Sequence, residues 1–240
     1  MKKIVLFAIL IFIAALTSFY AAENRESLNL AAAGLQSLDI DCGAGYLKVQ
    51  GVDGLEQIEV SALLVVRGIA DSELAEFKKE FVTVTLKKDM DRAVLIAKIK
   101  SNFSLPKLFS GVSEARIDLD IRVPLRLSLE IDDGSGDVDI RDCDGNVKLE
   151  DGSGDMHLTH IRGHVDIEDG SGDIELNDAG NDVDIDDGSG QISLHHIRGS
   201  VEVDDGSGDI VIDGAEKDVT IDEAGSGNVD ITNVKGRVRK

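Results

Sequence analysis

From residue 131 to the C-terminus, apolar and charged residues alternate in short runs that glycine-containing turns separate. In one stretch, residues 165–169 (Val-Asp-Ile-Glu-Asp) precede Gly170-Ser-Gly172, and a second alternating run covers residues 173–176. Alternation with period two places the apolar side chains on one face of a β-strand and the carboxylates on the other. The glycines supply the backbone freedom that a sharp corner needs. The pattern predicts two short strands joined by a tight turn.

This pattern repeats at a fixed length. The Gly-Ser-Gly turns begin at Gly134, Gly152, Gly170, Gly188, Gly206 and Gly225, so that successive turns are 18 residues apart and the last spacing is 19. One unit is too small to bury its apolar face, but stacked units can, with each strand paired in parallel to its equivalent about 4.8 Å away. We therefore predict an all-β fold, a single-stranded parallel β-solenoid with 18-residue coils, and about six coils over residues 131–240.

Residues 23–130 are less regular and predict a β-rich cap on the first coil. Residues 38–49 resemble a degenerate coil in which Gly-Ala-Gly replaces Gly-Ser-Gly. A short amphipathic helix is expected near residues 72–82, and residues 82–88 and 93–100 read as two strands around a turn. A solenoid needs such a cap because its open end exposes apolar side chains and unpaired strand edges.

Residues 1–22 predict export from the cytoplasm. Lys2 and Lys3 precede an unbroken run of 13 apolar residues at 4–16, after which the sequence becomes smaller and more polar. This is the pattern of a secretory signal peptide. An uncleaved N-terminal anchor is the alternative, because residues 4–22 are just long enough to span a bilayer. Either interpretation predicts a periplasmic, cell-envelope or secreted protein.

Acidic residues dominate the composition, with 46 Asp and Glu against 25 Lys and Arg and a formal net charge of −21. Such a polyanion repels nucleic acids and anionic lipid headgroups. We expect an unknown protein or polymer partner at the cell envelope, no nucleic-acid partner, and membrane contact only through an uncleaved N-terminus. Residues 131–224 contain no Phe, Tyr or Trp, which argues against a sugar groove within the coils because sugars usually stack on aromatic rings.

Two columns of aspartates flank the Gly-Ser-Gly corner. They comprise Asp133, Asp151, Asp169, Asp187 and Asp205 before the turn, and Asp137, Asp155, Asp173 and Asp209 after it. Carboxylates stacked at strand spacing could bind hard cations such as Ca²⁺. The favoured alternative is that an Asp before Gly accepts backbone N–H bonds within the turn. We expect no cofactor and, at most, weak Ca²⁺ binding.

A third column alternates Asp and His, as Asp142, His160, Asp178 and His196. This order favours a cross-strand ion-pair ladder over a row of weak Zn²⁺ or Ni²⁺ sites. Elsewhere, Phe103 and Phe109 fall in a predicted loop. They are expected to fold over the solenoid end, and the alternative is contact with a partner or a membrane.

The N-terminal signal, the run Ile117-x-Leu-x-Ile-x-Val-Pro124 and the Gly-Ser-Gly-Asp repeats together resemble a bacterial family of candidate adhesins with β-strand repeats. The family is formally a domain of unknown function, and the resemblance covers most of residues 35–240. It implies an envelope-associated β-solenoid and provides no catalytic residues to carry over.

The coils also lack the marks of an enzyme. No insertion interrupts residues 131–224, and the chain contains no Gly-x-Ser-x-Gly elbow, phosphate loop or His-Glu-x-x-His motif. We therefore expect a non-enzymatic binding or spacer module that uses its flat acidic strand faces. A self-assembling envelope scaffold is the alternative, and a polysaccharide-active β-helix enzyme ranks third.

Overall fold

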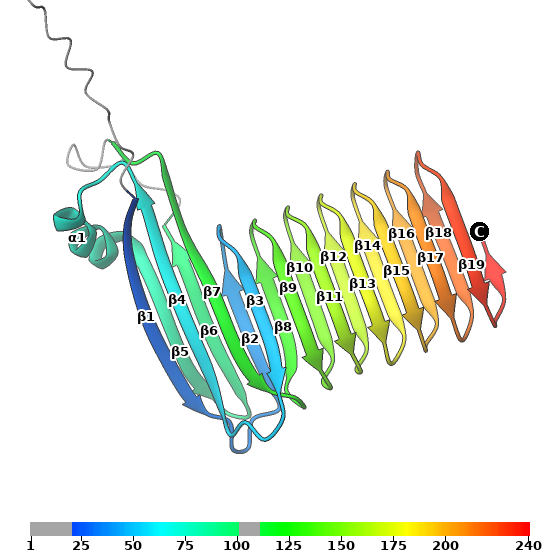
Figure 1. The fold of residues 1–240 in the computed structure, drawn as a ribbon, viewed down its shortest axis with the longest axis horizontal. Coiled ribbons are helices and arrows are strands. Elements are labelled where there is room, and N and C mark those ends of the chain that lie inside the picture. Colours follow the sequence, from blue (N-terminus) through cyan, green and yellow to red (C-terminus); the bar gives the residue numbers. More distant parts are fainter. Residues whose placement is uncertain (1–20, 101–110) are drawn as a thin grey trace, which may run out of the picture.

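The computed structural model describes residues 21–100 and 111–240. Two ten-stranded sheets face each other along the whole length of the molecule (Figure 1), and one α-helix completes the fold. The strand order in sheet A is β1-β4-β7-β3-β9-β11-β13-β15-β17-β19, and in sheet B it is β20-β18-β16-β14-β12-β10-β8-β2-β6-β5.

Each regular coil gives one strand to each sheet. The strands in sheet B are β8 (Ser128–Asp133), β10 (Val147–Asp151), β12 (Val165–Asp169), β14 (Val183–Asp187), β16 (Val201–Asp205), β18 (Val219–Ala224) and β20 (Val238–Arg239). The strands in sheet A are β9 (Val138–Cys143), β11 (Met156–Ile161), β13 (Ile174–Ala179), β15 (Ile192–Ile197), β17 (Ile210–Ala215) and β19 (Val229–Val234).

The register follows the sequence repeat. Neighbouring coil strands pair in parallel, and Val147 lies opposite Val165, which lies opposite Val183 in turn. The solenoid with 18-residue coils is therefore confirmed. Between β16 and β18 the register shifts after Val203, where the last unit of the repeat contains one extra residue.

The degenerate coil extends both sheets by one strand. β2 (Ser37–Cys42) pairs in parallel with β8, and β3 (Leu47–Val52) pairs in parallel with β9. A bridge between Ala44 and Ser135 aligns the Gly-Ala-Gly turn with the first Gly-Ser-Gly turn. The stack therefore begins before the regular repeat is visible in the sequence.

The cap consists mainly of longer strands that pair in antiparallel fashion. These strands are β1 (Ala21–Ala31), β4 (Gln57–Arg67) and β7 (Glu114–Pro124) in sheet A, and β5 (Val82–Asp89) and β6 (Arg92–Ile99) in sheet B. β7 and β6 join the coils through parallel pairing to β3 and β2. Strand β1 begins at Ala21 and buries Ala22, so the boundary predicted after residue 22 falls inside this strand; residues 1–20 lie outside the described part.

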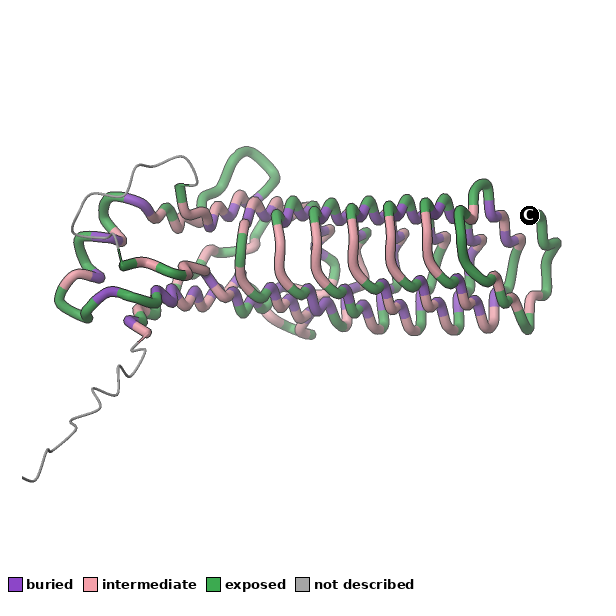
Figure 2. Tube along the Cα trace, turned by 90° about the horizontal axis from the view of Figure 1, so that it is seen from above, coloured by how far each residue is buried: buried purple, intermediate pink, exposed green. Residues whose placement is uncertain are grey.

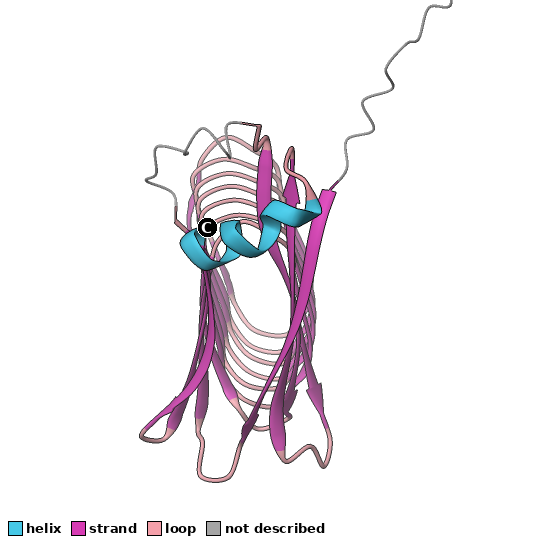
Figure 3. Cartoon of the chain, turned by 90° about the vertical axis from the view of Figure 1, so that its left-hand side faces the viewer, coloured by secondary structure: helices cyan, strands magenta, loops and turns pink. Residues whose placement is uncertain are grey.

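Helix α1 (Asp71–Phe81) lies across the N-terminal end of the two sheets (Figure 3). Its apolar side chains Leu74, Phe77 and Phe81 are buried, and the Glu73 carboxylate accepts the backbone N–H of Ala70 at 2.9 Å. The 11-residue helix closes the end of the core. Within residues 21–100 and 111–240, no helix is long and apolar enough to cross a membrane.

The hydrophobic core fills the space between the sheets, and buried positions recur along every coil (Figure 2). In one coil Val165, Ile167, Ile174 and Leu176 are fully buried, as period-two alternation predicts. Both cysteines, Cys42 and Cys143, are buried and free.

Candidate functional site

The first aspartate column points into the solenoid at the corner where the sheet-B strands end. Asp133, Asp151, Asp169, Asp187 and Asp205 are between 0% and 8% exposed. In the last four, Oδ1 accepts the backbone N–H of the serine two residues later at 2.9–3.2 Å. At Asp133, the Cys42 thiol donates to Oδ1 at 3.4 Å. No described residue forms a hydrogen bond with Oδ2 of any of the five.

Burial raises the pKa of these carboxyl groups. The pKa of Asp133, Asp169 and Asp187 rises to about 6, first because burial disfavours the charged form and also because neighbouring carboxylates repel a second charge. The pKa of Asp151 and Asp205 is raised for the same first reason. We call this set the inner aspartate row; it binds protons more tightly than free aspartate does.

The second aspartate column is exposed and links consecutive coils. Oδ1 of Asp137, Asp155, Asp173 and Asp209 accepts the backbone N–H of the equivalent residue one coil later, at 2.8–3.3 Å. Both columns therefore bind backbone groups. Within the described part of the chain, no three His, Cys, Asp or Glu side chains are grouped to hold a metal ion, and weak Ca²⁺ binding stays a prediction from charge alone.

The structure brings the alternating Asp and His column together. His160 Nδ1 lies 3.1 Å from Asp142 Oδ1 and its Nε2 lies 3.5 Å from Asp178 Oδ2, while His196 Nδ1 lies 3.8 Å from Asp178 Oδ1. All four residues have φ between 57° and 61°, a left-handed conformation that Asp, Asn and His tolerate better than most residues. A hollow of about 510 Å³ follows this row and is also lined by Arg162 and Arg198. Binding of Zn²⁺ or Ni²⁺ there stays a prediction.

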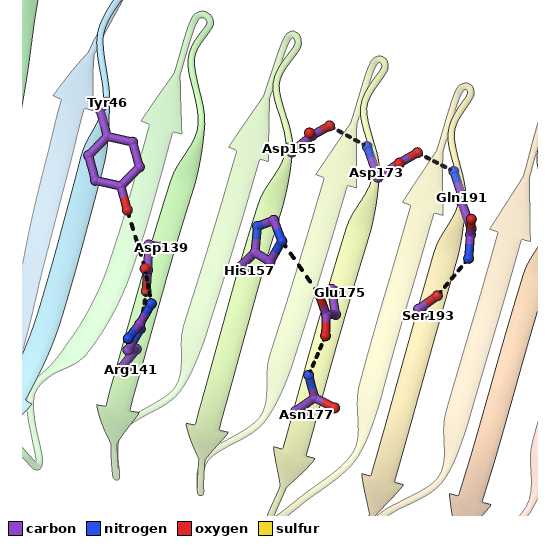
Figure 4. A network of polar contacts seen from close by, with 10 residues as sticks. All are labelled: Tyr46, Asp139, Arg141, Asp155, His157, Asp173, Glu175, Asn177, Gln191 and Ser193. Carbon is purple, nitrogen blue, oxygen red and sulfur yellow. Dashed lines mark hydrogen bonds and ion pairs between the residues drawn. The ribbon is translucent and has the colours of Figure 1, made fainter.

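A further polar site, which the sequence analysis missed, lies on the outer face of sheet A (Figure 4). The hydroxyl of Tyr46 donates to Asp139 Oδ2 at 3.2 Å, and the Arg141 guanidinium binds both oxygens of Asp139. Asp139 is only 7% exposed, whereas Tyr46 is 40% exposed. Burial, followed by the Asp139 charge, raises the pKa of Tyr46, so its hydroxyl stays protonated and can donate.

Polar side chains continue from Tyr46 over the next strands of the same face (Figure 4). His157 Nε2 lies 3.4 Å from Glu175 Oε2, and Asn177 donates to the other oxygen of Glu175 at 2.8 Å. Gln191, which immediately precedes β15, donates to Ser193 on that strand at 3.0 Å.

Two hollows lie over these residues, one of about 360 Å³ beside Tyr46 and one of about 230 Å³ beside Ser193. They share Asp155, His157 and Glu175, and therefore adjoin. We call them together the sheet-A groove, which is defined by Tyr46, Asp139, Arg141, Asp155, His157, Glu175, Asn177, Gln191 and Ser193.

The sequence contained a signal for this groove. Aligning Gly43-Ala44-Gly45 with Gly134-Ser135-Gly136 puts Tyr46 in the column of Asp137, on the same face as the coil side chains. Tyr46 lies outside residues 131–224, the regular coils that contain no Phe, Tyr or Trp. The two phenylalanines predicted to cover the end or contact a partner, Phe103 and Phe109, lie outside the described residues.

The fold and these surfaces define a capped parallel β-solenoid with polar outer faces. The chain belongs to the Toastrack DUF4097 family, whose model matches residues 35–238. This confirms the predicted family, which is a domain of unknown function. No curated protein matches the chain.

Several solved bacterial structures are similar to the chain in fold. A candidate cell adhesion protein from Clostridium sporogenes is 13% identical with a TM-score of 0.43, and the match covers 91% of this chain and 100% of that one. A candidate adhesin from Bacteroides fragilis is 14% identical with a TM-score of 0.49, covering 90% and 95%. A candidate lipid binding protein from Parabacteroides distasonis is 13% identical with a TM-score of 0.40, covering 90% and 96%.

Proposed function

We propose that this protein is a non-enzymatic binding module of the cell envelope. The observation that carries the proposal is the sheet-A groove, in which polar side chains begin at Tyr46, just before β3, and line the consecutive strands β9, β11, β13 and β15. The strands beneath it belong to a continuous hydrogen-bonded sheet with a packed core. A site on such a frame keeps its geometry without a partner, which lowers the entropic cost of binding.

The distribution of carboxylates supports binding over catalysis. Polysaccharide cleavage needs one pair of carboxyl groups with different roles at a single position. Here the inner aspartate row repeats one buried corner position in five coils, and in four of the five Oδ1 caps its own turn by accepting the N–H of the serine two residues later. A repeated environment fits a structural role because it singles out no reaction centre.

Location and charge indicate the kind of partner. The apolar run at residues 4–16 is typical of an export signal, and a net charge of −21 favours cationic partners over nucleic acids and anionic lipids. The proposal is therefore an exported module that binds a polymer bearing positive charge in the envelope.

Co-sedimentation tests this function. The full chain is mixed with insoluble peptidoglycan, chitosan or cellulose, and the bound fraction is measured at low and high salt while soluble reducing ends are assayed. We expect saturable binding to at least one polymer, weakening as salt screens charge, and no release of reducing ends. Absence of saturable binding to all three, or steady release of reducing ends, would contradict the proposal.

A self-assembling scaffold is the second candidate, and the C-terminal end of the solenoid is the observation that favours it. Val229, Ile231 and Val234 are only partly buried, and Val238 is 46% exposed. Strand β19 is the last strand of sheet A, so one edge of it has no neighbour within the described chain. Such an edge can template pairing with another strand.

A further inference from the structure

We propose that the sheet-A groove binds a saccharide chain that carries amino groups, with Tyr46 as its stacking platform. This inference rests on the proposed binding function and names its ligand class. It concerns one groove on one face, so it can fail while the binding function stands.

Tyr46 has the properties of a stacking platform. The residue is 40% exposed, and Figure 4 shows its ring lying over the sheet with the hydroxyl directed at Asp139. Asp139 is 7% exposed and is held in turn by Arg141, so the tyrosine is anchored at its polar end while a ring face stays open. The apolar C–H face of a pyranose stacks on such a ring, which combines an apolar surface with a polar tip.

The rest of the groove offers hydrogen bonds in a regular order. Side chains of His157, Asn177 and Ser193 stand on three successive strands, β11, β13 and β15, and parallel strands lie about 4.8 Å apart. Each of these groups both donates and accepts hydrogen bonds. A chain of hydroxyl-bearing units lying across the strands therefore meets a new polar pair at each strand, which a compact ligand cannot do.

Charge decides between an acidic, a neutral and an amine-bearing saccharide. Besides Asp155 and the half-buried Glu175, the exposed carboxylates of Asp137 and Asp173 also line the two hollows of the groove. The Arg141 guanidinium, in contrast, is already paired with Asp139. Oδ1 of each of the three aspartates binds a backbone N–H, which leaves Oδ2 as an acceptor. Ammonium groups on the sugar ring satisfy these acceptors, and uronic acids are repelled.

The test uses tyrosine fluorescence of the full chain. The protein has no Trp and only two tyrosines, Tyr20 and Tyr46, so a Tyr20→Phe background makes Tyr46 the single reporter. The probe is the hexasaccharide of glucosamine, with the hexasaccharide of N-acetylglucosamine as its uncharged match and oligogalacturonate as the acidic one. We expect a saturable change in tyrosine emission with the glucosamine probe, at least tenfold weaker binding of the acetylated probe, and none of the acidic one.

Variants then locate the site by calorimetry. Tyr46→Ala should weaken binding at least tenfold, Tyr46→Phe should keep part of it because the ring remains, and Asn177→Ala should weaken it severalfold. Arg198→Ala, in the hollow beside the Asp and His column, is the matched control and should bind like the parent. Thermal melts of each variant exclude unfolding as the cause.

Unchanged affinity in a folded Tyr46→Ala variant would overturn the inference, as would equal binding of the acetylated or acidic probe. If these results arise while polymers still co-sediment with the chain, the binding module stands and the groove assignment fails. If co-sedimentation is absent as well, both proposals fail.

Discussion

At the scale of single residues, the inner aspartate row is the costliest feature of the coils. A carboxylate oxygen that is buried without a hydrogen-bond partner loses its hydration, and here Oδ2 of five aspartates is in that position. Their neighbours in adjacent coils carry the same charge at strand spacing. Protonation removes both penalties, which is why the pKa of Asp133, Asp169 and Asp187 rises to about 6.

The row predicts a protein that gains stability on mild acidification. Because the folded-state pKa of these carboxyl groups lies above the unfolded value, the folded state binds more protons than the unfolded state. The stability gained from this proton binding is complete below about pH 4 and is lost as pH rises through about 6. Asp182 and Asp218, whose pKa is lowered, act in the opposite direction only at more acidic pH. We expect the melting temperature to fall from pH 5 to pH 8.

Replacing one member of the inner aspartate row tests whether its buried charge lowers the stability at high pH. Asp187→Asn keeps the acceptor for the Ser189 N–H but removes the charge, so it should stabilise the protein at pH 8 by about 1 kcal/mol, or about 2–4 °C. The exposed Asp186→Asn is the control and should change little. A melting temperature that rises between pH 5 and pH 8 in the parent would contradict this account.

The left-handed column gives a second prediction for single residues. His196 has φ of 59°, which a β-branched residue tolerates poorly, so His196→Val should cost about 1–2 kcal/mol of unfolding free energy. His157→Val lies at an exposed strand position, where Val is favoured, and should cost little. Urea unfolding compares the two, and equal losses would mean that backbone conformation does not select this column.

The aspartate columns were visible in the sequence, but their environments were only partly predictable. Strict alternation after Leu129 and Ile131 places Asp133 inward, yet its charge favoured an exposed turn position. The repeat shows which aspartates occupy equivalent positions in successive coils, whereas the burial of their carboxylates depends on how tightly the corner packs. The sheet-A groove was not predicted, because it combines Tyr46 of the degenerate coil with side chains of the regular coils.

At the scale of the elements, the turns fix the coil spacing. A Cβ at Gly172 would lie 1.9 Å from the carbonyl oxygen of Gly154, and φ there is 147°. At Gly43, in the equivalent turn of the degenerate coil, a Cβ would meet nothing within 4 Å. Gly45 of that same turn is the equivalent of Gly172, and a Cβ there would lie 2.1 Å from the carbonyl oxygen of Ile117. Glycine is therefore required at the second glycine of these turns and dispensable at Gly43.

This difference predicts the effect of two matched substitutions. Gly172→Ala should destabilise the protein by more than about 2 kcal/mol, because the backbone of one coil must shift away from the next. Gly43→Ala should stay within about 0.5 kcal/mol of the parent. Denaturant unfolding measures both, and a harmless Gly172→Ala would show that the coils are packed more loosely than the structure indicates.

The elements of the coils were predictable and those of the cap only in part. The repeat specified both strands of each coil, and helix α1 followed from its apolar face. Strands β1 and β4 were not anticipated, because they join sheet A through pairings distant in sequence, such as Asn29 with Glu59. The local pattern of apolar and polar residues does not specify which distant strand a cap strand pairs with.

At the scale of the whole molecule, the two ends differ. Helix α1 and the antiparallel strands close the N-terminal end (Figure 3), whereas the C-terminal coil exposes apolar positions and carries Lys235, Arg237 and Arg239. These cations pair with Glu216, Asp218 and Asp222 of the preceding coil. A second copy approaching that end would bring like charges together.

The arrangement predicts a monomer. The cap blocks head-to-tail stacking, and basic residues oppose pairing of two C-terminal ends. Light scattering of the full chain should give a mass near 25.7 kDa over a wide concentration range at low salt. Filaments or dimers that grow with concentration would instead favour the scaffold function.

The binding surface that we propose is the outer face of sheet A. It is tested by co-sedimentation with chitosan of two matched triple variants of the full chain, Tyr46→Ala/His157→Ala/Asn177→Ala on sheet A and Lys148→Ala/Glu150→Ala/Asp166→Ala on sheet B. We predict that the first variant loses most of its bound fraction and that the second retains it. Equal binding by both variants, or a loss confined to the sheet-B variant, would contradict the claim.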